Sequence, residues 1–105
     1  MTNVEERDGI ALAAETIGTG ETFSRVLESR DAKTISGIVD RSASYDIDLV
    51  WLTNEGSDIV TESIASGASG QTEFSEEWHS PKQCRIEITD TSSSSADAGI
   101  TVLVT

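Results

Sequence analysis

Several residue types are nearly absent from this 105-residue chain, and each absence excludes a class of protein. Cys84 is the single cysteine, so no intramolecular disulfide framework exists. Pro81 is the single proline, and no apolar run approaches the ~18 residues of a membrane-spanning helix. Met1 to Gly9 also lacks the apolar core of a signal peptide. We therefore expect one soluble domain that folds without disulfides and has no membrane partner.

Positive charge is scarce, and lysine most of all. Only Lys33 and Lys82 are lysines among seven basic residues, which face 19 Asp and Glu. The net charge of −12 destabilises a compact chain through self-repulsion. Concentrated salt removes that penalty, because the Debye length falls to about 3 Å at 1 M. The composition indicates adaptation to high salt, and it argues against nucleic acid and anionic lipid as direct partners.

The abundant residues are typical of strands. Ser and Thr supply 27 residues, and the apolar residues are mostly β-branched or aliphatic and alternate with polar ones in short runs. Polar or glycine-rich turns separate these runs at intervals of about 10 to 12 residues. The pattern predicts an all-β fold, an antiparallel β-sandwich of about eight strands that is jelly-roll-like or Ig-like. Residues 10–105 form this domain, and the charged residues 1–9 form a flexible N-terminal arm that orders on contact with a partner.

The clearest strand is Ser44 to Leu52, in which Tyr45, Ile47, Leu49 and Trp51 share one face. Val50 and Leu52 make its second half apolar on both faces, which predicts a central position or a covered outer surface. We expect the preceding strand to stop at residues 40–42, and residues 67–70 to form a loop. The predicted core consists of Tyr45, Ile47, Leu49, Trp51, Ile86, Ile88, Val102 and Val104.

The residues that enzymes use are sparse. His79 is the single histidine, in a turn next to Ser80, and no Gly-x-Ser-x-Gly elbow or glycine-rich phosphate loop occurs. Cys84 alternates with Ile86 and Ile88, so we expect a buried structural thiol. The chain is therefore expected to be no enzyme and to need no cofactor.

Two carboxylates are the weak candidates for a metal site. Asp46 and Asp48 lie on one face of the same strand, about 7 Å apart along the chain. Together with acids from a neighbouring strand they could hold a structural cation through oxygen ligands. Paired carboxylates also arise by composition alone in so acidic a chain, and a solvated face is the alternative that we favour.

Trp78 is the first candidate for an interface. It lies next to a turn and alternates with Glu76, which leaves it at the core edge or in a contact with another protein. The C-terminal strand has little charge to discourage pairing, so Ile100 and Val102 are further interface candidates. Trp51 and Phe74 are in phase with apolar neighbours and are expected in the core, although with Trp78 they could form an aromatic platform for sugar.

The layout of residues 31–105 resembles a known class of viral protein. The residues that carry this are the strand Tyr45 to Trp51, the hairpin through residues 54–56, the run Cys84 to Ser92 and the closing strand Ile100 to Thr105. This arrangement is similar to the small β-sandwich proteins that tailed viruses place on their particles as capsid decoration, turret, spike or tail components. Together with the acid excess, it resembles a virion component of a haloarchaeal tailed virus.

The resemblance implies a function in assembly. We expect a non-enzymatic virion structural protein that is assembled in the host cytoplasm and binds copies of itself as a homo-oligomer, together with a capsid or tail protein. The alternative is a carbohydrate- or host-surface-binding module, which requires aromatic side chains exposed on a concave face.

Overall fold

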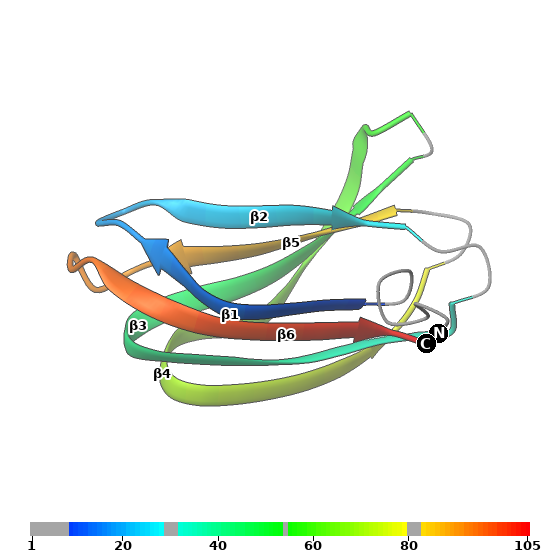
Figure 1. Cartoon of the computed structure of the whole chain (residues 1–105). Coiled ribbons are helices and arrows are strands. Elements are labelled where there is room, and N and C mark those ends of the chain that lie inside the picture. Colours follow the sequence, from blue (N-terminus) through cyan, green and yellow to red (C-terminus); the bar gives the residue numbers. More distant parts are fainter. Residues whose placement is uncertain (1–8, 29–31, 54, 80–82) are drawn as a thin grey trace.

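The computed structural model describes residues 9–28, 32–53, 55–79 and 83–105 (Figure 1). These residues form a six-stranded antiparallel sheet that curls into a half-barrel. The strands are β1 (Gly9–Ile17), β2 (Thr22–Leu27), β3 (Thr34–Leu52), β4 (Asp58–Glu77), β5 (Gln83–Asp90) and β6 (Ala96–Val104). The described part of the chain contains no helix with the length and apolar character needed to cross a membrane.

Two long strands replace four of the expected short ones. β3 continues through the predicted break at residues 40–42, and β4 continues through the predicted loop at 67–70. The β3–β4 register shifts between Arg41 and Tyr45, and Gly67 and Gly70 have φ values of 66° and 74°. Such irregularities bend a strand without ending its pairing. The all-β antiparallel class is confirmed. The sandwich of about eight strands is not, because the chain bends within β3 and β4 at the two positions where we expected a strand to end.

The bend in β3 determines the topology. The first half of β3 pairs with β6 and the second half pairs with β5, while β4 follows β3 along its other side. The strand order is β1-β6-β3-β5-β2, with β4 on β3. Because β3 bends in the middle, the β1–β6 side of the sheet curls over the β5–β2 side and encloses the core (Figure 1).

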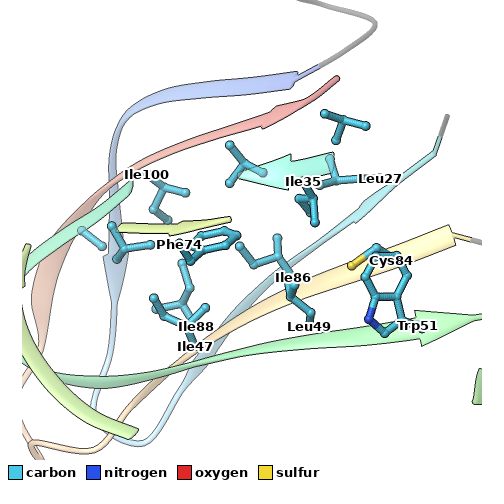
Figure 2. Close-up of a cluster of buried hydrophobic side chains, with 14 of the residues drawn as sticks. Leu27, Ile35, Ile47, Leu49, Trp51, Phe74, Cys84, Ile86, Ile88 and Ile100 are labelled. Atoms are coloured by element: carbon cyan, nitrogen blue, oxygen red, sulfur yellow. The ribbon is translucent and has the colours of Figure 1, made fainter. Parts of the chain in front are cut away.

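The core consists of the inward-facing side chains of the curled sheet, from both its β1–β6 side and its β5–β2 side. All eight residues of the predicted core are buried, with at most 2% of their surface exposed. Figure 2 shows Phe74 among Ile47, Ile86, Ile88 and Ile100, at the centre of the cluster. Period-2 alternation therefore identified the inward face of β3, β5 and β6 correctly.

The outer face of β3 is also covered, as its sequence predicted. Val50 and Leu52 are each 2% exposed. Strand β3 lies between β4 and β5, so that Val50 has Thr61 on one side and Arg85 on the other. The apolar second half of the strand thus reflects a central position.

Gly37 makes room for the ring of Phe74. The two residues are paired across β3 and β4. A Cβ atom at position 37 would lie 2.9 Å from two ring carbons of Phe74 and 2.7 Å from the carbonyl oxygen of Thr101. A side chain here would displace the ring or the backbone of β6, so the glycine is needed for packing.

Truncation of the core should be costly. We expect Ile47→Ala and Ile86→Ala each to lower the free energy of unfolding by about 2–5 kcal/mol, because both isoleucines are fully buried and each change leaves a cavity. Urea denaturation followed by tryptophan fluorescence measures this. The matched control is Ile38→Ala, at a position that is 41% exposed, which should cost no more than about 0.5 kcal/mol. Equal losses in all three variants would contradict the assigned faces.

The predicted N-terminal arm ends where strand β1 begins. Residues 1–8 lie outside the described residues. Gly9, the last residue of the predicted arm, is the first residue of β1 and is paired with Leu103. The strand thus begins one residue earlier than the predicted domain boundary.

Candidate functional site

Trp78, the first interface candidate, lies in an aromatic cluster at the end of the half-barrel. Its ring packs edge-on against Trp51, with 5.3 Å between centroids and 86° between planes. Only 6% of Trp78 is exposed, and its backbone N–H donates to the carbonyl of Lys33 at 2.9 Å. The side chain thus packs at the core edge, one of its two predicted positions, and any contact at this end must use its neighbours.

His79 and Glu62 complete this cluster. The His79 ring stacks on Trp51 with 4.4 Å between centroids and a tilt of 30°. Glu62 Oε1 accepts a hydrogen bond from Trp51 Nε1 at 2.6 Å and lies 3.8 Å from His79 Nε2. The His79 side chain is 41% exposed, as expected for a turn. The contacts of His79 and Glu62 with Trp51 therefore stabilise the aromatic cluster.

Cys84 is a structural thiol, as its alternation predicted. It is fully buried next to Trp51 in the core (Figure 2). Burial first, and the charge of Glu62 second, raise the pKa of the Cys84 thiol to about 12. The thiol is therefore protonated at neutral pH and is a poor nucleophile and metal ligand.

Ile100 and Val102, the other interface candidates, point into the core. Each is 1% exposed. Strand β6 lies between β1 and β3, so both of its edges are already paired. The low charge of this strand therefore accompanies pairing inside the sheet, where β1 covers the edge that β3 leaves open. The outward side chains of β6 near its end belong to Thr101 and Leu103.

Asp46 and Asp48, the metal candidates, lie on the outer face of β3 as expected. Asp46 Oδ1 accepts a hydrogen bond from the Gly67 N–H at 2.7 Å and so holds the bend of β4. Partial burial, and then the charges of Asp46 and Glu87, raise the pKa of Asp48 above its ordinary value. Among the described residues, no three His, Cys, Asp or Glu are placed to hold a metal ion. The structure therefore adds no support for a cation here.

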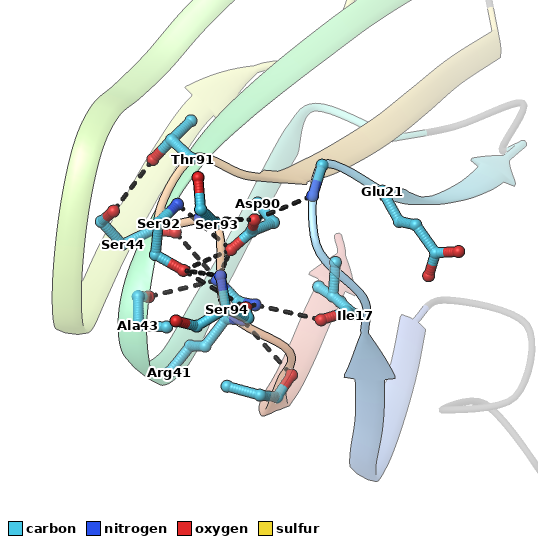
Figure 3. A network of polar contacts seen from close by, with 12 residues as sticks. Ile17, Glu21, Arg41, Ala43, Ser44, Asp90, Thr91, Ser92, Ser93 and Ser94 are labelled. Carbon is cyan, nitrogen blue, oxygen red and sulfur yellow. Dashed lines mark hydrogen bonds and ion pairs between the residues drawn. The ribbon is translucent and has the colours of Figure 1, made fainter.

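The sequence analysis missed a buried ion pair at the opposite end of the half-barrel. Arg41 Nη1 lies 3.0 Å from Asp90 Oδ1, and neither side chain is exposed. Figure 3 shows the guanidinium surrounded by backbone carbonyls. It donates to those of Ser44 at 2.8 Å, Ile17 at 3.1 Å and Ser94 at 3.1 Å. Arg41 thereby ties the bend of β3 to the ends of β1 and of the β5–β6 loop.

Asp90 is held from the other side. Its carboxylate accepts hydrogen bonds from the Ser92 hydroxyl at 2.6 Å, the Gly20 N–H at 2.9 Å and the Ser93 N–H at 3.1 Å. The hydrogen bonds from Ser92 and Gly20, followed by that from Arg41, hold the pKa of Asp90 well below its ordinary value. The Arg41–Asp90 pair thus joins the β1–β2 turn and the β5–β6 loop to the bend of β3 and closes this end of the core.

The lowered pKa of Asp90 predicts an acid-sensitive stability. The folded state favours the ionised carboxylate, so its contribution is complete above the ordinary value of 3.8 and is lost as the pH falls below it. The difference in melting temperature between the wild type and Asp90→Asn should be constant above about pH 5 and should narrow below about pH 4. The exposed Asp40→Asn control should follow the wild type throughout. A difference that is independent of pH would contradict this assignment.

Five large apolar side chains are exposed in the part of the chain that the structure describes. Each is between 41% and 48% exposed, and they are Val26, Ile38, Ile59, Val60 and Leu103. Ile59 and Val60 lie at the start of β4, in the β3–β4 hairpin that projects from the sheet in Figure 1. Val26 lies on β2, at an edge of the sheet. These positions, and not those that the sequence singled out, are the exposed apolar points.

Comparison with known proteins shows a shared fold and no family. No protein-family model matches the chain, and no curated protein matches its sequence. The fold is similar to that of VP2 of infectious bursal disease virus in its subviral particle. The TM-score is 0.66 at 16% identity, over 91% of this chain and 31% of the VP2 chain. A chain of the T13 particle of the same virus gives a TM-score of 0.62 at 12% identity, over 92% of this chain and 29% of that one.

The same fold also occurs in a small protein of another kind. A periplasmic inhibitor of g-type lysozyme from Aeromonas hydrophila is similar with a TM-score of 0.55 at 10% identity, over all of this chain and 93% of that protein. This chain thus spans about a third of the length of the viral chains, and nearly all of the inhibitor. At these identities the likeness is one of fold.

Proposed function

We propose that the chain is a non-enzymatic structural component of a virus particle, which assembles with copies of itself and with a capsid or tail protein. The observation that carries the proposal is the likeness to a viral particle protein, which extends over 91% of this chain. Function does not follow from fold alone, so the proposal also uses the surface. The exposed apolar residues Ile59 and Val60 lie on a projecting hairpin, where another protein can reach them.

The setting of this assembly is part of the proposal. A net charge of −12 supports a virus of a halophilic host, because repulsion among the carboxylates is screened in strong salt. In such salt, contacts between proteins depend on apolar surface and backbone pairing more than on ion pairs. A haloarchaeal tailed virus is the specific source that we propose.

The alternative is a carbohydrate- or host-surface-binding module. Sugar binding requires aromatic faces that solvent can reach. In the described chain, Trp51 and Tyr45 are fully buried, and Trp78 and Phe74 are 6% and 9% exposed. The half-barrel is filled by its own core. Phe23 on β2 is half-buried and is the aromatic ring of the described chain that solvent reaches most readily. The burial of the other four rings supports the structural function, and Phe23 keeps the carbohydrate-binding module as the second candidate.

Mass spectrometry of purified virus particles tests the proposal. We expect the chain at a fixed stoichiometry relative to the major capsid protein after the particles are washed in high salt. A glycan-array screen of the isolated protein, expected to be negative, is the parallel measurement. Absence from washed particles together with specific glycan binding would overturn the proposal in favour of the alternative.

A further inference from the structure

Strand β2 is the one strand of the described sheet without an acidic residue. Its six residues, Thr22–Leu27, carry a single charge, that of Arg25, in a chain of net charge −12. It pairs with β5 and with no other strand of the described residues. The β2–β5 register runs from end to end without a shift. Strand β2 thus presents a regular and nearly uncharged edge.

The other edges of the sheet carry features that oppose pairing with another chain. The regular part of β4 contains Glu73, Glu76 and Glu77, and the rest of β4 is interrupted by register shifts. Strand β1 has an irregularity between Leu12 and Glu15. Charges, bulges and prolines are the usual protections of an exposed edge. Strand β2 has no carboxylate, no bulge and no proline.

The backbone of β2 has identifiable groups on its free side. The carbonyl of Glu21 accepts a hydrogen bond from the Asp90 N–H at 2.9 Å, so residue 21 faces β5. In an antiparallel ladder every second residue faces the same neighbour. Thr22, Ser24 and Val26 therefore direct their N–H and C=O groups away from β5. These three residues are all exposed.

We propose that β2 pairs antiparallel with β2 of a second copy of this chain, in the register centred on Ser24. The inference rests on the proposed self-assembly and names its interface. A two-fold axis at this position sets Ser24 opposite Ser24 of the second copy and Thr22 opposite Val26. All three outward-facing residues then exchange backbone hydrogen bonds in both directions.

The side chains of β2 fit a second copy in this register. Arg25 comes opposite Phe23 of the second copy, with Glu21 as its diagonal neighbour. In the single chain the guanidinium already lies 5.9 Å from the centroid of the Phe23 ring, so the same cation–π contact is available across the axis. Val26, which is 45% exposed, is covered by the other strand. The edge thus offers both the charge and the aromatic ring that its copy requires.

The strength of this contact follows from its small size. Five paired residues on each strand bury less than the ~1,200 Å² of a standard stable interface, so we expect a dissociation constant in roughly the micromolar range. Repeated contacts in a particle would add to one another. Because backbone bonds and apolar cover provide the affinity while the net charge opposes it, pairing should strengthen as salt increases. A basic protein partner would be bound less well in high salt.

Sedimentation velocity of charge-swapped variants tests the register. Ser24→Glu and Ser24→Lys each place like charges opposite each other at the axis. In about 0.2 M KCl, where screening over this short distance is partial, each variant alone should dimerise at least about tenfold more weakly than the wild type. An equimolar mixture of the two should recover the dimer, because the opposed charges are then complementary. Ser63→Glu is the matched control: Ser63 is exposed and lies opposite Asp48, as Ser24 lies opposite Glu87. This control should dimerise like the wild type.

The outcomes separate this inference from the proposed function. A wild type that stays monomeric up to about 100 μM in 2 M KCl overturns the β2 pairing. So does a mixture that fails to recover the dimer while circular dichroism shows both variants folded. If the chain is nevertheless present in washed particles, it is a virion protein held by a different partner. If it pairs through β2 but is absent from particles, the interface is supported and the virion function is not.

Discussion

Replacing Arg41 with methionine should lower the free energy of unfolding by about 3–5 kcal/mol, the largest loss that we expect from a single side chain outside the apolar core. The change leaves the buried carboxylate of Asp90 without its counter-charge. It also removes the donors from the carbonyls of Ile17, Ser44 and Ser94. Buried polar groups without partners are destabilising because they have lost their hydrogen bonds to water and form none within the protein. Guanidinium denaturation at pH 7 measures the loss.

The double variant Arg41→Met/Asp90→Leu is the control for the ion pair. If the cost of Arg41→Met comes mainly from the orphaned charge, removing that charge as well should recover part of the loss. The orphaned carbonyls remain in both variants, and Asp90→Leu also leaves the N–H groups of Gly20 and Ser93 without their acceptor, so recovery is incomplete. A loss below about 1 kcal/mol for Arg41→Met would show that this end of the half-barrel is held by its backbone pairing alone.

Raising the salt concentration from about 0.1 M to 2 M KCl should raise the melting temperature by roughly 10 °C or more, which corresponds to about 2 kcal/mol for a domain of this size. Nineteen carboxylates against seven basic residues repel one another in dilute buffer. Asp48 experiences this directly, since the charges of Asp46 and Glu87 contribute to its raised pKa. Differential scanning fluorimetry over a salt series measures the effect.

The shape of the salt curve distinguishes screening from other effects of salt. Screening by KCl saturates once the Debye length falls below the spacing of the charges. A salt that is excluded from the protein surface, such as a sulfate, continues to stabilise the folded state at higher concentrations. We therefore expect most of the rise below about 1 M KCl. Asp48→Asn should show a smaller rise than the wild type, because it relieves one repulsive cluster beforehand. A melting temperature that is flat or falling would refute the proposed adaptation to high salt.

Alternation in the sequence was enough to assign the inward face of β3, β5 and β6. From Tyr45 to Trp51 every second residue is buried, and Cys84, Ile86 and Ile88 continue the same face on the next strand. This follows from local geometry, because successive side chains of any strand point to opposite faces. The acid excess, the buried thiol and the central position of β3 were likewise visible without coordinates.

Where a strand ends was not visible in the same way. The polar residues 40–42 and the glycines at 67 and 70 have the composition of turns, yet β3 and β4 continue through them as bends. A bend and a turn use the same residue types. Which one forms depends on whether the strand beyond the irregularity finds a partner. Here β3 pairs with β6 before the bend and with β5 after it, so the strand has a partner on both sides of the irregularity.

The sequence by itself determined the strand-forming character of the chain, the inward face of its strands and its electrostatic state, since all three are local or additive properties. Only the tertiary structure decided that Arg41 meets Asp90, 49 residues away, and that β6 is central while β2 is an edge. The strand that contains Ile100 and Val102 has little charge, and only the structure shows that β1 pairs with it. Pairing partners lie far apart in the chain, and no local pattern records which of several compatible strands becomes the neighbour.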